Sequence, residues 1–119
     1  SLKNQNNFII FVFMYKVYLI QEDGTDNYKI GVTRRRVKDR IKGLASGNSN
    51  RLLEVTHYET ELGYKLETAL HNYFKGLGKD SKEWFEFIDF DKTIFLDVCH
   101  KLNENLIFLK KNNSLCDSW

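Results

Sequence analysis

The chain has 119 residues, of which 42% are hydrophobic and 14% aromatic, enough for one domain with one modest core. Its formal net charge is only +2, but residues 29–42 hold seven Lys and Arg against one acid, so this segment carries +6 and the rest −4. The longest apolar run, residues 8–14, is far shorter than the ~20 residues of a membrane span, so we expect a protein that does not enter the membrane. Cys99 and Cys116 form no zinc or disulfide pattern, which favours a cytoplasmic protein.

The first half of the chain predicts two strands, a helix and a third strand. Residues 17–21 and 28–33 alternate and are rich in β-branched and aromatic side chains, and the turn-forming residues 22–27 between them favour a hairpin. From residue 37 the apolar spacing becomes helical, up to a plausible end near Gly47. Residues 52–60 alternate again and predict the third strand.

The second half predicts a helix over residues 62–77, a short extended segment over 83–87 and a last helix that begins near Asp89 or Asp91. The expected fold is α+β: a small three-stranded antiparallel sheet with flanking helices, a short extra strand and a C-terminal helix. The expected organisation is an N-terminal extension (1–13), a main domain (14–90), a helix packed on it (91–111) and a tail (112–119). Patterned sequence begins directly after Met14, which is an alternative start by hypothesis.

Positive charge gathers directly after the predicted hairpin. A local basic patch is typical of a protein that binds a polyanion, although a run of charge on a helix is also common as a plain solvent-facing surface. Seven residues are the candidates for contact with substrate: Gly31, Arg34, Arg35, Arg36, Lys38, Lys42 and His71.

Several short motifs occur in a fixed order: VYLI, YKIG after a turn, an arginine on the next helix, ELGYKLETALHNYF and EWF. In this order they resemble the GIY-YIG nuclease superfamily, and most closely its branch typified by a phage T5 reading frame and the meiotically up-regulated gene domain. The resemblance spans residues 17–87. It implies a compact nuclease domain that cuts DNA phosphodiester bonds with one divalent metal ion, Mg²⁺ or Mn²⁺, and a phage or mobile-element context.

The resemblance assigns roles to single positions. Tyr18 takes the place of the first motif's tyrosine, which handles a proton or positions water, and Gly31 closes the second motif. Arg40 matches the arginine that stabilises phosphate charge, and Glu67 matches the metal-binding glutamate. Lys29 departs from the pattern because it stands where the second motif usually has its tyrosine, so the version of the mechanism that needs this tyrosine does not carry over directly. The implied catalytic set is Tyr18, Lys29, Arg40 and Glu67.

The residues themselves are compatible with this chemistry. In the right register Tyr18 and Lys29 share one face of the hairpin, and Arg40 flanks the apolar stripe of the first helix, where its planar guanidinium can reach a phosphate. Glu67 and His71 lie one helical turn apart. A carboxylate is a hard ligand that suits Mg²⁺ or Mn²⁺.

Each residue also has a structural interpretation. Tyr18 alone is compatible with a half-buried strand aromatic, Lys29 with a solvated sheet edge, and Gly31 with a bulge. Trp84 is assigned mainly to the core, with the alternative that it covers the site, and Glu83 is a second carboxylate of open role.

Three classes of function therefore stay open. The leading expectation is a metal-dependent endonuclease acting on DNA, with RNA as an open alternative, as a monomer or weak dimer. The second is a nucleic-acid-binding module that keeps the fold without cleavage, and the third is a role in protein interaction or structure.

Overall fold

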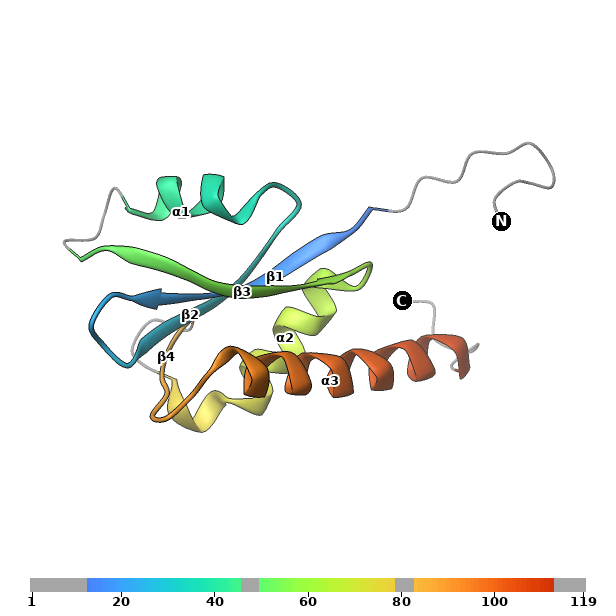
Figure 1. The fold of residues 1–119 in the computed structure, drawn as a ribbon. Coiled ribbons are helices and arrows are strands. Elements are labelled where there is room, and N and C mark those ends of the chain that lie inside the picture. Colours follow the sequence, from blue (N-terminus) through green and yellow to red (C-terminus); the bar gives the residue numbers. More distant parts are fainter. Residues whose placement is uncertain (1–12, 46–49, 79–82, 113–119) are drawn as a thin grey trace.

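The computed structural model describes residues 13–45, 50–78 and 83–112. Within these ranges, seven helices and strands and one 3-10 turn follow one another in the order β1 (Tyr15–Glu22), β2 (Asn27–Thr33), α1 (Val37–Ala45), β3 (Leu52–Thr60), α2 (Gly63–Tyr73), a 3-10 turn (Lys75–Leu77), β4 (Trp84–Glu86) and α3 (Lys92–Asn112) (Figure 1). The expected α+β class and the predicted helices are confirmed. The predicted extension and tail lie outside the described residues, except for Phe13 and Asn112. Among the described helices, none combines the length and apolar character needed to cross a bilayer.

The sheet has four antiparallel strands in the order β3-β1-β2-β4, so the prediction of a three-stranded sheet is wrong. The short extra strand β4 joins the sheet because it pairs with the outer edge of β2, where Trp84 lies opposite Lys29. In the hairpin of β1 and β2, Tyr18 lies opposite Gly31 and Ile20 opposite Lys29. Side chains alternate along a strand, so these four residues share one face of the sheet.

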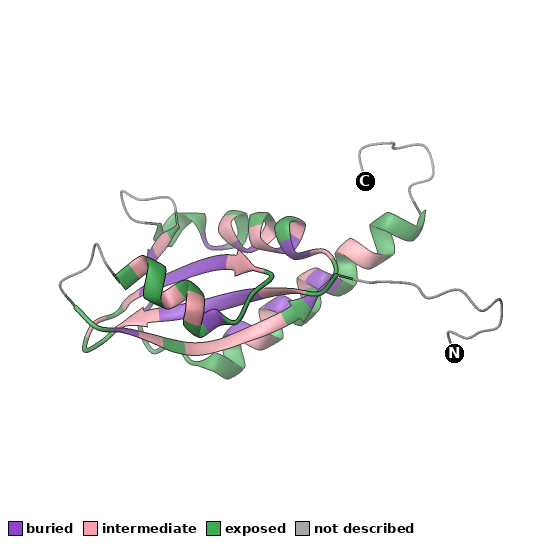
Figure 2. Cartoon of the chain, turned by 90° about the horizontal axis from the view of Figure 1, so that it is seen from above, coloured by how far each residue is buried: buried purple, intermediate pink, exposed green. Residues whose placement is uncertain are grey.

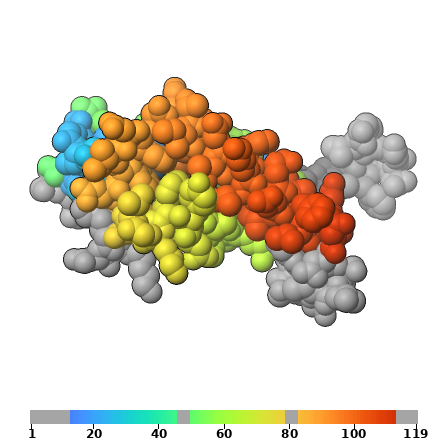
Figure 3. Space-filling model, turned by 90° about the horizontal axis from the view of Figure 1, so that it is seen from below, coloured from blue at the N-terminus to red at the C-terminus, as the bar shows by residue number. Residues whose placement is uncertain are grey.

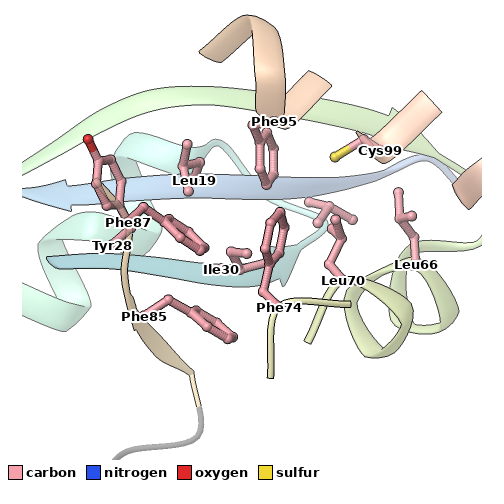
Figure 4. Packing of buried hydrophobic residues seen from close by; sticks show 11 residues of the cluster. Leu19, Tyr28, Ile30, Leu66, Leu70, Phe74, Phe85, Phe87, Phe95 and Cys99 are labelled. Carbon is pink, nitrogen blue, oxygen red and sulfur yellow. The ribbon is translucent and has the colours of Figure 1, made fainter. Parts of the chain in front are cut away.

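The main core lies on the other face of the sheet, beneath α2 and α3 (Figures 3 and 4). Val17, Leu19 and Ile30 are fully buried there, and α2 and α3 cover them with apolar stripes at helical spacing. The buried helical residues are Leu66 and Leu70 of α2 and Phe95 and Cys99 of α3. Burial raises the pKa of the Cys99 thiol to about 12.

A smaller cluster lies on the first face, under α1, which runs alone above the sheet in Figure 1 and is mostly exposed in Figure 2. It consists of Tyr18, Ile20, Val37 and Leu52, with Ile41, Leu44 and Trp84 packed against it. Helix α1 buries only Val37 completely. The thin cover on this face leaves the polar end of Tyr18 within reach of side chains from α1.

Candidate active site

Tyr18 lies in the middle of β1 with only 1% of its surface exposed. Its hydroxyl accepts a hydrogen bond from Nε of Arg40 on α1, at 3.3 Å. The tyrosine ring crosses over Gly31, where a Cβ atom would come within 2.2 Å of the Tyr18 hydroxyl and 2.4 Å of Cζ. Gly31 therefore makes room for the tyrosine, and the space above its Cα is filled by that ring. The pairing of β2 with β1 runs through Gly31 without a register shift, so this glycine does not mark a bulge.

The environment of Tyr18 favours the protonated phenol. Burial raises its pKa above the ordinary value, and this effect outweighs the hydrogen bond and the charge of Arg40, which lower it. The nearby carboxylates of Glu83 and Glu67 raise it further. Because the oxygen accepts from Arg40, the hydroxyl proton is available to donate to a substrate oxygen or to water.

Lys29 of β2 is buried, with 5% of its surface exposed, and its ammonium group forms a salt bridge with the carboxylate of Glu83. The pairing of β4 with β2 brings Glu83 there and also places the Trp84 ring centroid 5.9 Å from the Lys29 Nζ. The hydrogen bond from Lys29 lowers the pKa of Glu83 below its usual range, against a smaller raising effect of burial. Glu83 is thus the partner of Lys29, and Trp84 lies beside the site rather than in the main core.

Glu67 of α2 is half-buried, and burial raises the pKa of its carboxyl group above the ordinary value. Among the groups close enough to affect it, His71, Lys29 and Arg40 lower this pKa and Glu83 raises it. In the described part of the chain no hydrogen bond or salt bridge engages the Glu67 carboxylate. An acid from α2 and a guanidinium from α1 therefore face the same region, next to the Tyr18 hydroxyl.

His71 fixes α2 against the edge of β2. Its Nε2 donates a hydrogen bond to the carbonyl oxygen of Ile30 at 2.9 Å, beyond the point where β4 stops pairing. Its ring packs edge-to-face on Phe85, with 5.3 Å between centroids. This anchor positions Glu67, one helical turn earlier, beside Lys29. The expected contact of His71 with substrate stays a prediction.

The basic residues after the hairpin divide into two groups. Arg34 and Arg35 join Arg40 in lining a cleft of about 380 Å³, together with Val32, Thr33, Asp39, Gly43 and Tyr64. The others lie on the exposed surface of α1 and the turn before it, namely Arg36, Lys38 and Lys42. Arg36 forms a salt bridge with Asp39, 3.1 Å from Nε to Oδ2.

The comparisons with known proteins give one family. The family model of the T5orf172 domain matches residues 15–107. The chain belongs to the T5orf172 domain family. T5orf172 domains occur in nuclease-related proteins, which indicates a nuclease-like or nucleic-acid-related role. No curated protein and no solved structure matches the chain significantly.

The match covers every residue of the candidate site, and it extends past the 17–87 span of the motifs to include most of α3. In this T5orf172 domain the site combines groups from four elements: Tyr18 on β1, Lys29 on β2, Arg40 on α1 and Glu67 on α2. Sequence reasoning left Glu83 without a role and did not select Tyr64. The sequence signal for Glu83 was its position at the start of the predicted extended segment 83–87.

The donor set of the T5orf172 site suits a hard cation that needs few protein ligands. Within the described ranges, no three His, Cys, Asp or Glu side chains gather into a group that could hold a metal ion. Glu83 is already paired with Lys29, so Glu67 supplies the carboxylate that is left for a cation. Mg²⁺ fits this arrangement, since it is commonly bound through one or two carboxylates and keeps several of its waters.

Proposed function

We propose that this T5orf172 domain is a GIY-YIG-type endonuclease that hydrolyses DNA phosphodiester bonds with a divalent metal ion. The observation that carries the proposal is the hydrogen bond from Arg40 to Tyr18 beside the half-buried carboxylate of Glu67. These three groups come from positions far apart in the chain. A purely structural tyrosine would not need an exposed arginine and a desolvated acid around its hydroxyl.

Arg40 and Tyr18 act on the phosphate and on the proton. The exposed guanidinium of Arg40 presents planar N–H donors that match two phosphate oxygens, while its Nε holds the phenol in place. The phenol is protonated at neutral pH, because its ordinary pKa is 10.0 and burial raises this pKa further. From this fixed position Tyr18 positions the attacking water or gives a proton to the leaving oxygen.

Glu67 would hold the metal ion, in the neighbourhood of the Lys29 ammonium group. A bound Mg²⁺ or Mn²⁺ supplies charge stabilisation to the reacting phosphate. A cation would stabilise the ionised carboxylate of Glu67 more than that of Glu83. Glu83 is paired with Lys29, whereas Glu67 has no direct ionic partner among the described residues. Glu83 and Trp84 hold Lys29 in place where the superfamily usually has a tyrosine, and the carboxylate of Glu83 offsets most of the positive charge of its ammonium group.

Nicking of supercoiled plasmid tests the proposal. The protein is incubated with Mg²⁺ or Mn²⁺ and with EDTA, beside Glu67→Gln and the matched control Glu104→Gln, which changes an exposed acid on α3. We expect nicking that needs both the metal and Glu67 and that Glu104→Gln leaves unchanged. DNA binding without cleavage, weakened by salt and indifferent to metal and Glu67, would instead identify the non-catalytic binding module. If the protein neither cleaves nor binds DNA, both functions are refuted.

A further inference from the structure

We propose that the cleft beside Arg40 binds an unpaired nucleotide of the substrate strand, with its base stacked on Tyr64. The inference rests on the proposed function and names the preferred substrate: DNA with a single-stranded segment next to the cleaved bond. Tyr64 lies in the first turn of α2 and lines the same cleft as Arg34, Arg35 and Arg40. It leaves 61% of its surface exposed.

The Tyr64 ring is held in place without being covered. It packs edge-to-face on Tyr15 of β1, with 5.2 Å between the centroids. The guanidinium of Arg34 lies 6.0 Å from the Tyr15 ring centroid and 5.4 Å from that of Phe13. Tyr64 and three arginines therefore line the cleft together, and Tyr15 supports both the Tyr64 ring and Arg34. This combination is typical of sites for single-stranded nucleic acid, in which bases stack on aromatic rings and cations follow the backbone.

The charge of the cleft suits a phosphate. Three arginines line it, and its one acid, Asp39, is engaged by Arg36 in a salt bridge. The volume of about 380 Å³ is near the lower end of ligand pockets, which agrees with one nucleotide rather than a base-paired duplex. A base inside a duplex has both faces covered by its neighbours, so only an unpaired base offers a face to Tyr64. Because Arg40 belongs to both the cleft and the Tyr18 contact, a nucleotide held here lies directly beside the reacting phosphate.

The test compares two probes with four proteins in EDTA, so that no cleavage occurs. Fluorescence anisotropy measures the binding of a short labelled oligothymidine and of a blunt duplex of equal length. The proteins are the wild type, Tyr64→Ala, Tyr64→Phe and Tyr73→Ala. Tyr73 is the matched control because it is also a tyrosine of α2 and is equally exposed at 61%, but it lies at the other end of the helix.

We expect the wild type to bind the single strand more tightly than the duplex. Tyr64→Ala should weaken single-strand binding about tenfold, the value of one stacked base, with little effect on the duplex. Tyr64→Phe and Tyr73→Ala should bind like the wild type. Equal affinity of the wild type for both probes overturns the inference, as does an equal loss for both probes in Tyr64→Ala. If Tyr64→Ala still nicks plasmid and binds single strands normally, the inference fails while the proposed function stands; if the wild type binds neither probe and does not nick, both fail.

Discussion

Replacing Gly31 with alanine tests whether this glycine exists to admit the Tyr18 ring. The added Cβ atom would lie 2.2 Å from the Tyr18 hydroxyl oxygen and 2.4 Å from Cζ, far inside van der Waals contact. The backbone of Gly31 pairs with Tyr18 itself in the centre of the sheet, so neither strand can move away easily. The ring must therefore shift or rotate, and its hydrogen bond with Arg40 is lost with the shift.

The expected loss of unfolding free energy follows from three terms. Overpacking of a filled core costs about 1–3 kcal/mol, and loss of the hydrogen bond costs about 0.5–1.5 kcal/mol. The alanine makes the unfolded chain less flexible, which offsets about 0.4–1 kcal/mol. The net expectation for Gly31→Ala is a loss of about 0.5–4 kcal/mol in unfolding free energy, with a loss of nicking at temperatures where the variant is still folded.

Gly43→Ala is the matched control, because a Cβ atom at Gly43 of α1 meets nothing within 4 Å. In a helix the same replacement should stabilise the protein by up to about 1 kcal/mol. Urea unfolding of both variants and the wild type measures the two changes, which should have opposite signs. If Gly31→Ala is as stable and as active as the wild type, the Tyr18 ring does not lie over Gly31 and the description of the site is wrong.

Three further predictions address the charged groups. Glu67→Gln should raise the melting temperature at neutral pH, because burial in the folded protein favours the neutral carboxyl group. This gain should vanish below pH 4.5, where Glu67 is protonated in the unfolded chain as well. An equal gain at all pH values would contradict the prediction. Arg40→Lys keeps the charge but loses the planar fork, so nicking should fall by at least about tenfold while the unfolding free energy falls by no more than about 1 kcal/mol; parallel losses would point to a structural role. Lys29→Met should reduce the loss of stability on acidification below pH 4.5, since the lowered pKa of Glu83 depends mainly on Lys29; unfolding curves of both proteins across this range would show it.

The fold was predictable to the extent that it follows from regular spacing. Alternation marked the hairpin and β3, and helical stripes marked α1, α2 and α3. The place of the short extra strand in the sheet was not predictable in this way. Strand β4 has three residues and no periodicity of its own, and its place is decided by pairing with β2, where Trp84 lies opposite Lys29. Such a pairing depends on the tertiary fold rather than on the local pattern.

The site residues that belong to sequence motifs were predictable, but their interaction partners far away in the sequence were not. Motif order selected Tyr18, Arg40 and Glu67, and the structure brings these three groups into electrostatic contact. Glu83 is 54 positions from Lys29, and no spacing rule connects two charges that meet only through a paired strand. Tyr64 was not predicted as a site residue, because the sequence does not show which side chains surround an exposed aromatic of a helix.

The residues that stabilise the fold and the proposed catalytic residues lie only partly on different faces of the sheet. The face under α2 and α3 holds the larger core, so a truncation such as Leu70→Ala should lower stability by about 2–5 kcal/mol without touching a catalytic group. The face under α1 is different, because Tyr18 is both a proposed catalytic residue and the largest member of the small cluster that holds the helix. Any change that loosens α1 therefore also moves Arg40 relative to the phenol. For this reason a loss of activity from variants on this face is informative only when compared with a variant such as Arg40→Lys, whose side chain is exposed and outside the packed cluster.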